Sequence, residues 1–181
     1  MEDNKSLLHQ YLPGSTMRYG TYAGGELVWR VLAREGKKRL LLADRILANR
    51  PYHTAYVNTS WRECSLRRWL NQDFFQEAFS FQERTWILNT RVENPANPKY
   101  RTNGGAGTVD KIFLLSIGEA ETYLPSQEER ALDNWWWLRT PGCNLLTAVS
   151  VYADGSLYDG GINVHFPDGG VRPAMWVLLH E

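Results

Sequence analysis

Two short apolar runs open the pattern of hydrophobic and polar positions along the chain. They occupy residues 27–34 and 39–47, and the polar, Gly-containing segment 35–38 separates them. Short runs rich in Leu and Val on either side of a turn are typical of a β-hairpin. The pattern therefore predicts two antiparallel strands near the start of the chain.

A helical period follows the two strands. Apolar side chains recur there every four residues, at Leu66, Leu70, Phe74 and Ala78. This spacing predicts an amphipathic helix over residues 61–79. Thr59 and Ser60 precede it, and either can act as the N-cap because its hydroxyl can accept a hydrogen bond from the first turn.

Two capping boxes predict further helix starts. Ser80 and Glu83 have the S-x-x-E spacing, and so do Ser116 and Glu119. In such a box each side chain satisfies a main-chain N–H group of the other residue. We therefore expect a second helix from residue 81 and a short helix over residues 117–124.

The remaining segments are irregular or strand-like. Residues 93–107 are rich in Pro, Asn and Gly, which predicts a long surface loop, and residues 111–115 (KIFLL) predict a strand. From Trp135 onward short strands alternate with Gly-containing turns. This order predicts one α+β domain over residues 1–181, with an antiparallel sheet, two main helices and a loop-rich C-terminal half.

The segment 148–159 (AVSVYADGSLYD) predicts a hairpin around Asp154-Gly155. A two-residue turn would mix apolar and polar side chains on both faces. A three-residue loop with a left-handed Gly155 avoids this. It pairs Tyr152 with Ser156, Val151 with Leu157, and Ser150 with Tyr158. We expect Val149, Val151 and Leu157 to face the core, and Ser150, Tyr152, Ser156 and Tyr158 to face solvent.

Composition and charge narrow the choice of partner. Lys plus Arg and Asp plus Glu both number 20, so no overall field attracts nucleic acid or an anionic membrane. Eight Trp and nine Tyr exceed what packing requires, and an aromatic surplus indicates a recognition surface. In Trp135-Trp136-Trp137, alternation along a strand turns Trp136 away from its two neighbours.

Secretory signals and membrane-spanning segments have recognisable sequence patterns. The first ten residues, MEDNKSLLHQ, lack the basic and apolar regions of a secretory signal, and no apolar run reaches transmembrane length. We expect a soluble protein that is cytoplasmic as synthesised and that reaches a virion or cell surface only through a partner.

The C-terminal third carries specific motifs. They are WWLRTPG at 136–142, Asp154-Gly155, and GVRPA at 170–174. Their combination resembles the C-terminal module (WWLRSPG, then DG, then GVRPA) of a bacterial and phage domain family of unknown function, over about residues 25–178. The resemblance implies a C-type-lectin-like fold, similar to that of formylglycine-generating enzyme. Some members look like variable proteins that diversity-generating retroelements alter by mutating template adenines.

A feature of the sequence fits this mode of variation. Adenine changes in AAC or AAT codons cannot produce Lys, Glu, Gln, Met or Trp, and none of these occurs from Thr140 to Val171. A β-rich, turn-rich segment also disfavours Lys, Glu and Met, so the structure of the segment is an alternative explanation for their absence. The same segment has three Asp and no Lys or Arg, which disfavours a phosphate ligand.

We therefore expect a variable ligand-binding protein whose partner is a protein. The candidate binding residues are Cys143, Asn144, Leu145, Leu146, Thr147, Ser150, Tyr152, Ser156, Tyr158, Asp159, Asn163, His165 and Phe166. Leu145, Leu146 and Phe166 could instead be buried under neighbouring loops. Arg139 and Arg172, on either side of this set, are interpreted as structural because Arg can bond several buried carbonyl groups.

The alternative functions are an enzyme or metal-dependent relative and a sugar-binding lectin. Cys64 and Cys143 lie far apart, and the four His residues (His9, His53, His165 and His180) are scattered. Glu93-Asn94-Pro95 and Asp133-Asn134-Trp135 share letters with calcium-lectin motifs, but in another order. We expect no catalysis, no cofactor and no metal.

Overall fold

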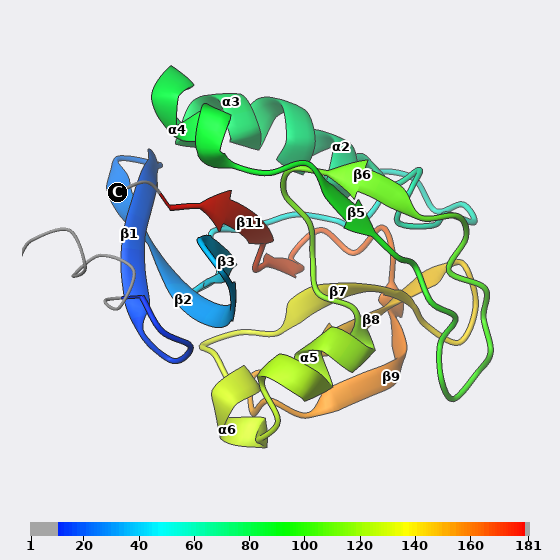
Figure 1. Ribbon diagram of the computed structural model, residues 1–181. Helices are drawn as coiled ribbons and strands as arrows, with labels where there is room; N and C mark the ends of the chain where they lie inside the picture. The colour runs from blue at the N-terminus through cyan, green and yellow to red at the C-terminus, as the bar shows by residue number, and fades with distance from the viewer. Residues whose placement is uncertain (1–10, 180–181) are drawn as a thin grey trace, which may run out of the picture.

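The computed structural model describes residues 11–179, which form a mainly β structure with few helices (Figure 1). The strands are β1 (Thr16–Tyr22), β2 (Gly25–Glu35), β3 (Lys38–Ala43), β4 (Ala48–Asn49), β5 (Thr90–Val92), β6 (Thr108–Asp110), β7 (Trp136–Pro141), β8 (Thr147–Val151), β9 (Leu157–Asn163), β10 (Gly170–Val171) and β11 (Ala174–Leu178). The helical segments are α2 (Ser65–Trp69), the π-helical η2 (Leu70–Phe74), α3 (Phe75–Ala78), α4 (Phe81–Trp86), α5 (Ile117–Tyr123) and α6 (Gln127–Arg130).

The strands form three sheets. A four-stranded sheet has the order β1-β2-β3-β11, a five-stranded sheet has the order β4-β10-β7-β8-β9, and β5 pairs with β6. All these pairings are antiparallel except that of β10 with β7. Because β11 pairs with β3, the first and last strands belong to the same sheet. The predicted α+β class with a mainly antiparallel sheet is confirmed.

The first predicted hairpin is also confirmed. β2 and β3 pair antiparallel, and the register ends with Glu35 opposite Lys38. The second strand is shorter than expected because the chain leaves the four-stranded sheet after Ala43. The N–H group of Leu47 donates to the carbonyl oxygen of Val171 on β10 at 3.0 Å. The end of the predicted apolar run therefore connects the two larger sheets.

The long helix has the predicted buried face but begins later than expected. It runs from Ser65 to Ala78 through α2, η2 and α3, and its buried positions include Leu66, Leu70, Phe74 and Ala78. Cys64 is the N-cap, and its sulfur accepts a hydrogen bond from the Arg67 N–H at 3.4 Å. The prediction of Thr59 or Ser60 as the cap is wrong, because the N–H of Cys64 closes a turn onto the Ser60 carbonyl.

Capping boxes determine where the short helices begin. The two predicted boxes start α4 at Ser80 and α5 at Ser116. A third box, Ser126 with Glu129, starts α6. It has the same S-x-x-E spacing, so the sequence contained the signal for this helix although no helix was predicted there.

The predicted strand at 111–115 is wrong. Only Phe113 makes a β-bridge, to Ala174, and the neighbouring strand is β6 at Thr108–Asp110. The four apolar residues from Ile112 to Leu115 are all buried. The run is apolar because this connecting segment is buried on every side. A short apolar run of this kind has the same pattern as a buried strand, so periodicity alone cannot tell the two apart.

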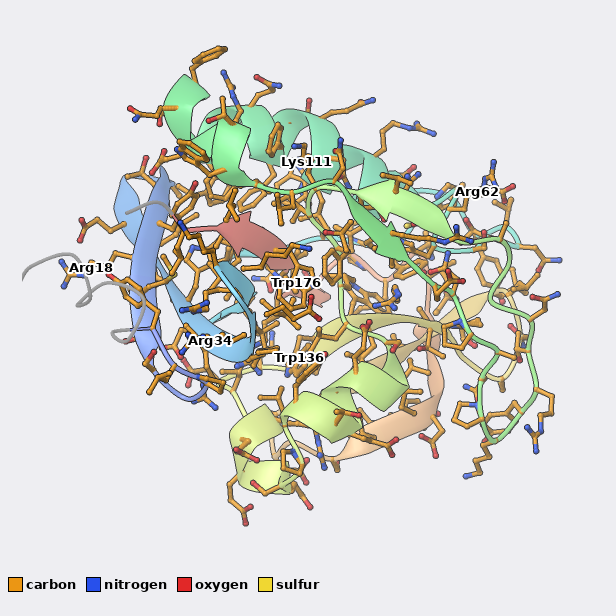
Figure 2. All side chains as sticks on the ribbon, in the orientation of Figure 1. Arg18, Arg34, Arg62, Lys111, Trp136 and Trp176 are labelled. Atoms are coloured by element: carbon orange, nitrogen blue, oxygen red, sulfur yellow. The ribbon has the colours of Figure 1, made fainter. Side chains whose placement is uncertain are left out.

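The tryptophans belong mainly to the core. Five of the eight are buried, namely Trp29, Trp61, Trp69, Trp136 and Trp137, and none of the others is classed as exposed. Trp136 lies in the interior of the molecule, near α5 (Figure 2). Most of the tryptophans therefore serve packing, while recognition by the remaining, accessible aromatic residues stays a prediction. The exposed aromatic side chains are instead mainly tyrosines.

Candidate functional site

The hairpin of β8 and β9 has the predicted register. Val151 pairs with Leu157 and Ser150 with Tyr158. The Tyr152 N–H donates to the Ser156 carbonyl at 2.8 Å, which closes the three-residue loop. Gly155 has a φ of +85°, as a left-handed loop residue requires.

The two faces of this hairpin differ in exposure. Val149 and Val151 are buried and Leu157 packs against the core. On the other face Tyr152 and Tyr158 are 41% and 40% exposed. Their rings stack with centroids 5.2 Å apart and an interplanar angle of 17°. These two tyrosines are accessible to a ligand, as predicted.

Ser150 lies on the predicted face but is buried, so its predicted exposure is wrong. It is paired with Trp137 on β7 and with Tyr158 on β9, and it has no solvent-accessible surface. Because β8 lies between these two strands, the large neighbouring side chains cover a small residue. Ser150 cannot touch a ligand in this structure, whereas Ser156, at the loop, is half-buried.

The other candidate residues lie in the loops on either side of the hairpin or on its strands, with Thr147 on β8 and both Asp159 and Asn163 on β9. Cys143, Asn144, His165 and Phe166 are exposed, and Leu145, Leu146, Thr147, Asp159 and Asn163 are half-buried. Phe166 is therefore not covered by neighbouring loops, while Leu145 and Leu146 are partly covered.

Ring contacts join these aromatic residues to others distant in sequence. The Tyr152–Tyr158 stack lies on the same face of the sheet as Trp135 and Trp137, and Trp135 contacts Phe166 at a centroid distance of 5.9 Å. His165 contacts Tyr56, also at 5.9 Å. Trp137 is fully buried. We call the other six residues the aromatic surface: Tyr56, Trp135, Tyr152, Tyr158, His165 and Phe166. The sequence did not indicate Tyr56, which has no periodic or motif context.

The backbone under the aromatic surface is held largely by main-chain hydrogen bonds. The Cys143 N–H donates to the Gly160 carbonyl, and the Val164 N–H donates to the Leu146 carbonyl, at 2.8 and 2.9 Å. At Gly142 and Gly161 a side chain would collide with the main chain of the neighbouring strand. The side-chain oxygens of Asn144 and Asn163 also accept hydrogen bonds from the N–H groups of Leu146 and His165, at 2.8 and 3.1 Å, so glycines, peptide groups and these two asparagines together set the shape of this region.

The charged side chains of this region are carboxylates, and two of the three have hydrogen-bond or ion-pair partners. The Ser156 hydroxyl and N–H both bond to the Asp154 carboxylate and hold its pKa below the usual value. The carboxylate of Asp159 lies 3.9 Å from the Lys99 ammonium group. Asp168 is exposed. The rim of the aromatic surface therefore favours cationic groups on a ligand.

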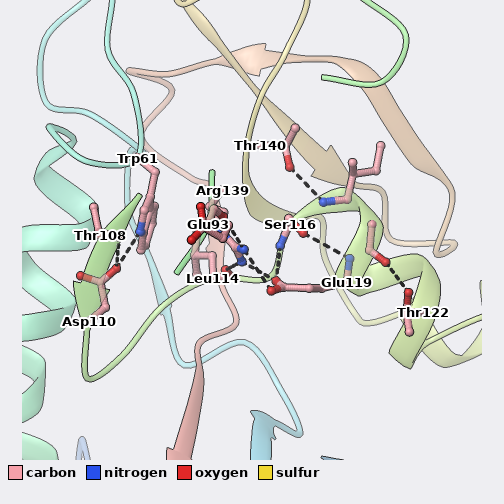
Figure 3. Close-up of polar contacts among 12 residues, drawn as sticks. Trp61, Glu93, Thr108, Asp110, Leu114, Ser116, Glu119, Thr122, Arg139 and Thr140 are labelled. Atoms are coloured by element: carbon pink, nitrogen blue, oxygen red, sulfur yellow. Dashed lines mark hydrogen bonds and ion pairs between the residues drawn. The ribbon is translucent and has the colours of Figure 1, made fainter. Parts of the chain in front are cut away.

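Arg139 has the structural role that was predicted (Figure 3). Its buried guanidinium donates to the carbonyl oxygens of Glu93 and Leu114, at 2.8 and 2.7 Å, and pairs with the Glu119 carboxylate. Glu119 also caps α5, so Arg139 ties β7 to that helix. Arg172 is buried over the Trp136 ring at 4.9 Å, and burial lowers its pKa to about 10. Neither Arg is exposed to a ligand.

The residues weighed for catalysis do not come together. Cys64 and Cys143 are free thiols, and burial raises the pKa of Cys64 to about 12, which keeps it protonated. Glu93 is exposed and pairs with Arg91. Within residues 11–179, no group of three or more His, Cys, Asp or Glu side chains could hold a metal ion. His9 and His180 lie outside the described residues.

Comparison with known proteins identifies the family. A family model described as "Domain of unknown function (DUF6273)" matches residues 36–179. The chain belongs to this family. The DUF6273 match contains every helix that the structure describes between residues 11 and 179 and the whole aromatic surface, whereas β1 and β2 precede it. No curated protein and no solved structure matches the chain. Among the helices that the structure describes, none is long and apolar enough to span a membrane.

Proposed function

We propose that this DUF6273 domain is a ligand-binding protein whose C-terminal region displays variable side chains, as a target of a diversity-generating retroelement. One observation carries the proposal. In the segment 140–171, which lacks the five residue types that adenine mutagenesis cannot produce, glycines and main-chain bonds hold a backbone that exposes aromatic side chains. Such a backbone tolerates changes at exposed positions whose side chains do not support it, such as Tyr152, Tyr158 and Phe166.

We further propose that the architecture is a variant of the C-type-lectin-like fold. Three features support this assignment. The first and last strands share one sheet, a helix precedes the loop-rich half, and the C-terminal strands carry the exposed surface. The proposed scaffold and the proposed variation are separate, so either can fail without the other.

The chemistry of the aromatic surface favours a protein as ligand. Tyr and other aromatic side chains are enriched at protein-recognition sites, because a rigid ring buries a large area at a small entropic cost. Tyr152, Tyr158 and Phe166 supply such rings, and the acidic residues lie at their margin. We therefore propose a protein partner that presents apolar side chains flanked by basic ones.

Deep sequencing of the gene in its natural population tests the variation. We expect substitutions at codons of exposed residues such as Tyr152, Tyr158 and Phe166, at positions that correspond to template adenines. The codons of Gly142 and Gly161 are the internal control, because the backbone there leaves no room for a side chain. Variation spread evenly over all codons, or none in excess of the rest of the gene, would contradict the proposal.

A further inference from the structure

The long loop between β5 and β6 contacts the candidate binding region, although it lies far from it in sequence. Figure 1 shows this loop extending from β5 toward β9 and the turn between β7 and β8. The buried Asn97 side chain makes the connection. Its amide donates to the carbonyl oxygens of Pro141 and Asp159 at 2.8 and 2.9 Å.

Asn97 also shapes the loop itself. Its side-chain oxygen accepts hydrogen bonds from the N–H groups of Lys99 and Tyr100 at 2.9 and 3.0 Å. Its own N–H and carbonyl group bond to Thr102 and Arg101, both at 2.9 Å. One buried side chain thus orders the loop and attaches it to β9, so little conformational entropy remains for binding to remove.

The attachment brings Tyr100 next to the aromatic surface. Tyr100 is 44% exposed. The Tyr100 hydroxyl and the Tyr158 ring both lie 3.6 Å from the position that a side chain on Gly160 would take. The two tyrosines therefore face the same point of β9, and Lys99 beside Tyr100 neutralises part of the charge of Asp159.

We propose that the binding surface is composite: Tyr100 supplies a fixed contact beside the variable positions, and Asn97 positions it. This inference rests on the proposed function. The loop lies outside 140–171 and contains Lys99, a residue type that the adenine mechanism cannot produce. Every variant of the surface would then keep one tyrosine available to the same protein partner, and tyrosine is among the commonest residues at protein-binding hot spots.

The competing explanation is that the loop only covers an edge. β9 is the outer strand of its sheet, and proteins commonly cover such strands to prevent pairing between molecules. An edge cover needs the Asn97 contacts but not an exposed tyrosine ring. The two explanations therefore differ in what removal of the Tyr100 ring does to binding.

Peptide probes selected on the protein can separate them. A random peptide library displayed on phage is first depleted on the Tyr152→Ser, Tyr158→Ser double variant and then selected on the wild-type protein. Several enriched peptides are synthesised with a fluorescent label. Their Kd is measured by anisotropy against the wild type, Tyr100→Ala, and Phe81→Ala as a matched control, because Phe81 is a 78% exposed aromatic residue on α4.

We expect Tyr100→Ala to raise the Kd of most of these peptides at least about fivefold, as at a hot spot, and Phe81→Ala to leave it unchanged. Equal melting temperatures of wild type and Tyr100→Ala establish that folding is intact. If every peptide retains its affinity for Tyr100→Ala, the composite surface is wrong while the proposed function stands. If the selection yields no peptide that discriminates against the depletion variant, the proposed function fails, and the inference fails with it.

A double-mutant cycle tests the positioning role of Asn97. Asn97→Ala alone should weaken peptide binding, because Tyr100 loses its position. In a Tyr100→Ala background the same change should add little further loss of affinity. If the fold-losses of affinity from Asn97→Ala and Tyr100→Ala multiply in the double variant, the two residues act independently and Asn97 does not position Tyr100.

Discussion

Two buried polar side chains near the candidate site, Asn97 and Ser150, differ in how well they are satisfied. Asn97 uses its side-chain amide and oxygen in four hydrogen bonds. Within residues 11–179 the Ser150 hydroxyl has no hydrogen-bond partner. A buried polar group without a partner lowers stability because it loses its bonds to water and gains none in return.

Replacement of Ser150 should therefore stabilise the protein. We expect Ser150→Ala to raise the free energy of unfolding by about 1 kcal/mol, since the hydroxyl costs desolvation without compensation. Chemical denaturation measures the change. Ser156→Ala is the matched control on the same hairpin, because its hydroxyl bonds to Asp154 and its loss should not stabilise. A Ser150→Ala variant less stable than wild type would indicate a missing partner for this hydroxyl.

The Asp154 carboxylate gives the loop of the hairpin a pH dependence. The bonds from Ser156 favour the ionised form and lower the Asp154 pKa. For a lowered pKa, the stabilising contribution is present above the unfolded-state pKa of about 3.9 and is lost as the pH falls through the folded-state value. NMR titration of the carboxyl carbon should show the Asp154 pKa rising in Ser156→Ala. If the Asp154 pKa is unchanged in Ser156→Ala, the hydrogen bonds from Ser156 do not cause the lowered pKa.

At the scale of elements, local chemistry determined what the sequence could predict. The three-residue loop followed from the apolar pattern together with Asp154-Gly155, and the capping boxes followed from spacing alone. The segment 111–115 was predicted wrongly because its burial comes from contacts between sheets. The start of the long helix depends on a turn at Ser60, which competes with the helix for the same residues.

Gly155 shows how tightly an element can specify one residue. It has a positive φ, and a Cβ there would collide with the Gln127 carbonyl oxygen of α6. We expect Gly155→Ala to lower the free energy of unfolding by at least about 2 kcal/mol, through strain and displacement of α6. Gly36 is the control, because its φ is +57° but no atom lies near its Cβ position. Denaturation curves measure the loss for both alanine variants. If Gly36→Ala lowers the free energy of unfolding as much as Gly155→Ala, the positive φ alone explains the loss and the collision with α6 does not contribute.

At the scale of the whole molecule, the sequence could locate only part of the candidate site. The segment 143–166 was predicted, since its motifs and composition are continuous in the chain. Tyr56 and Tyr100 come from loops without periodicity, and only the folded chain brings them to His165 and Gly160. Contacts between distant loops depend on the packing of all sheets together, so no local pattern contains them.

The division between scaffold and display surface predicts a contrast in stability across the molecule. Joint replacement of Tyr152, Tyr158, His165 and Phe166 by Ser or Asn changes exposed positions, each of which usually costs within about 0.5 kcal/mol. The Tyr152–Tyr158 stack adds about 0.5–1.5 kcal/mol to the loss.

Trp137→Ala instead removes a fully buried ring that packs on Tyr52 and donates to the Arg50 carbonyl at 2.9 Å. It should cost about 3–5 kcal/mol. Thermal melts of both proteins supply the comparison, and circular dichroism at low temperature establishes whether each folds. If the quadruple variant melts as low as Trp137→Ala, these four residues support the fold, and a freely variable surface at their positions is excluded.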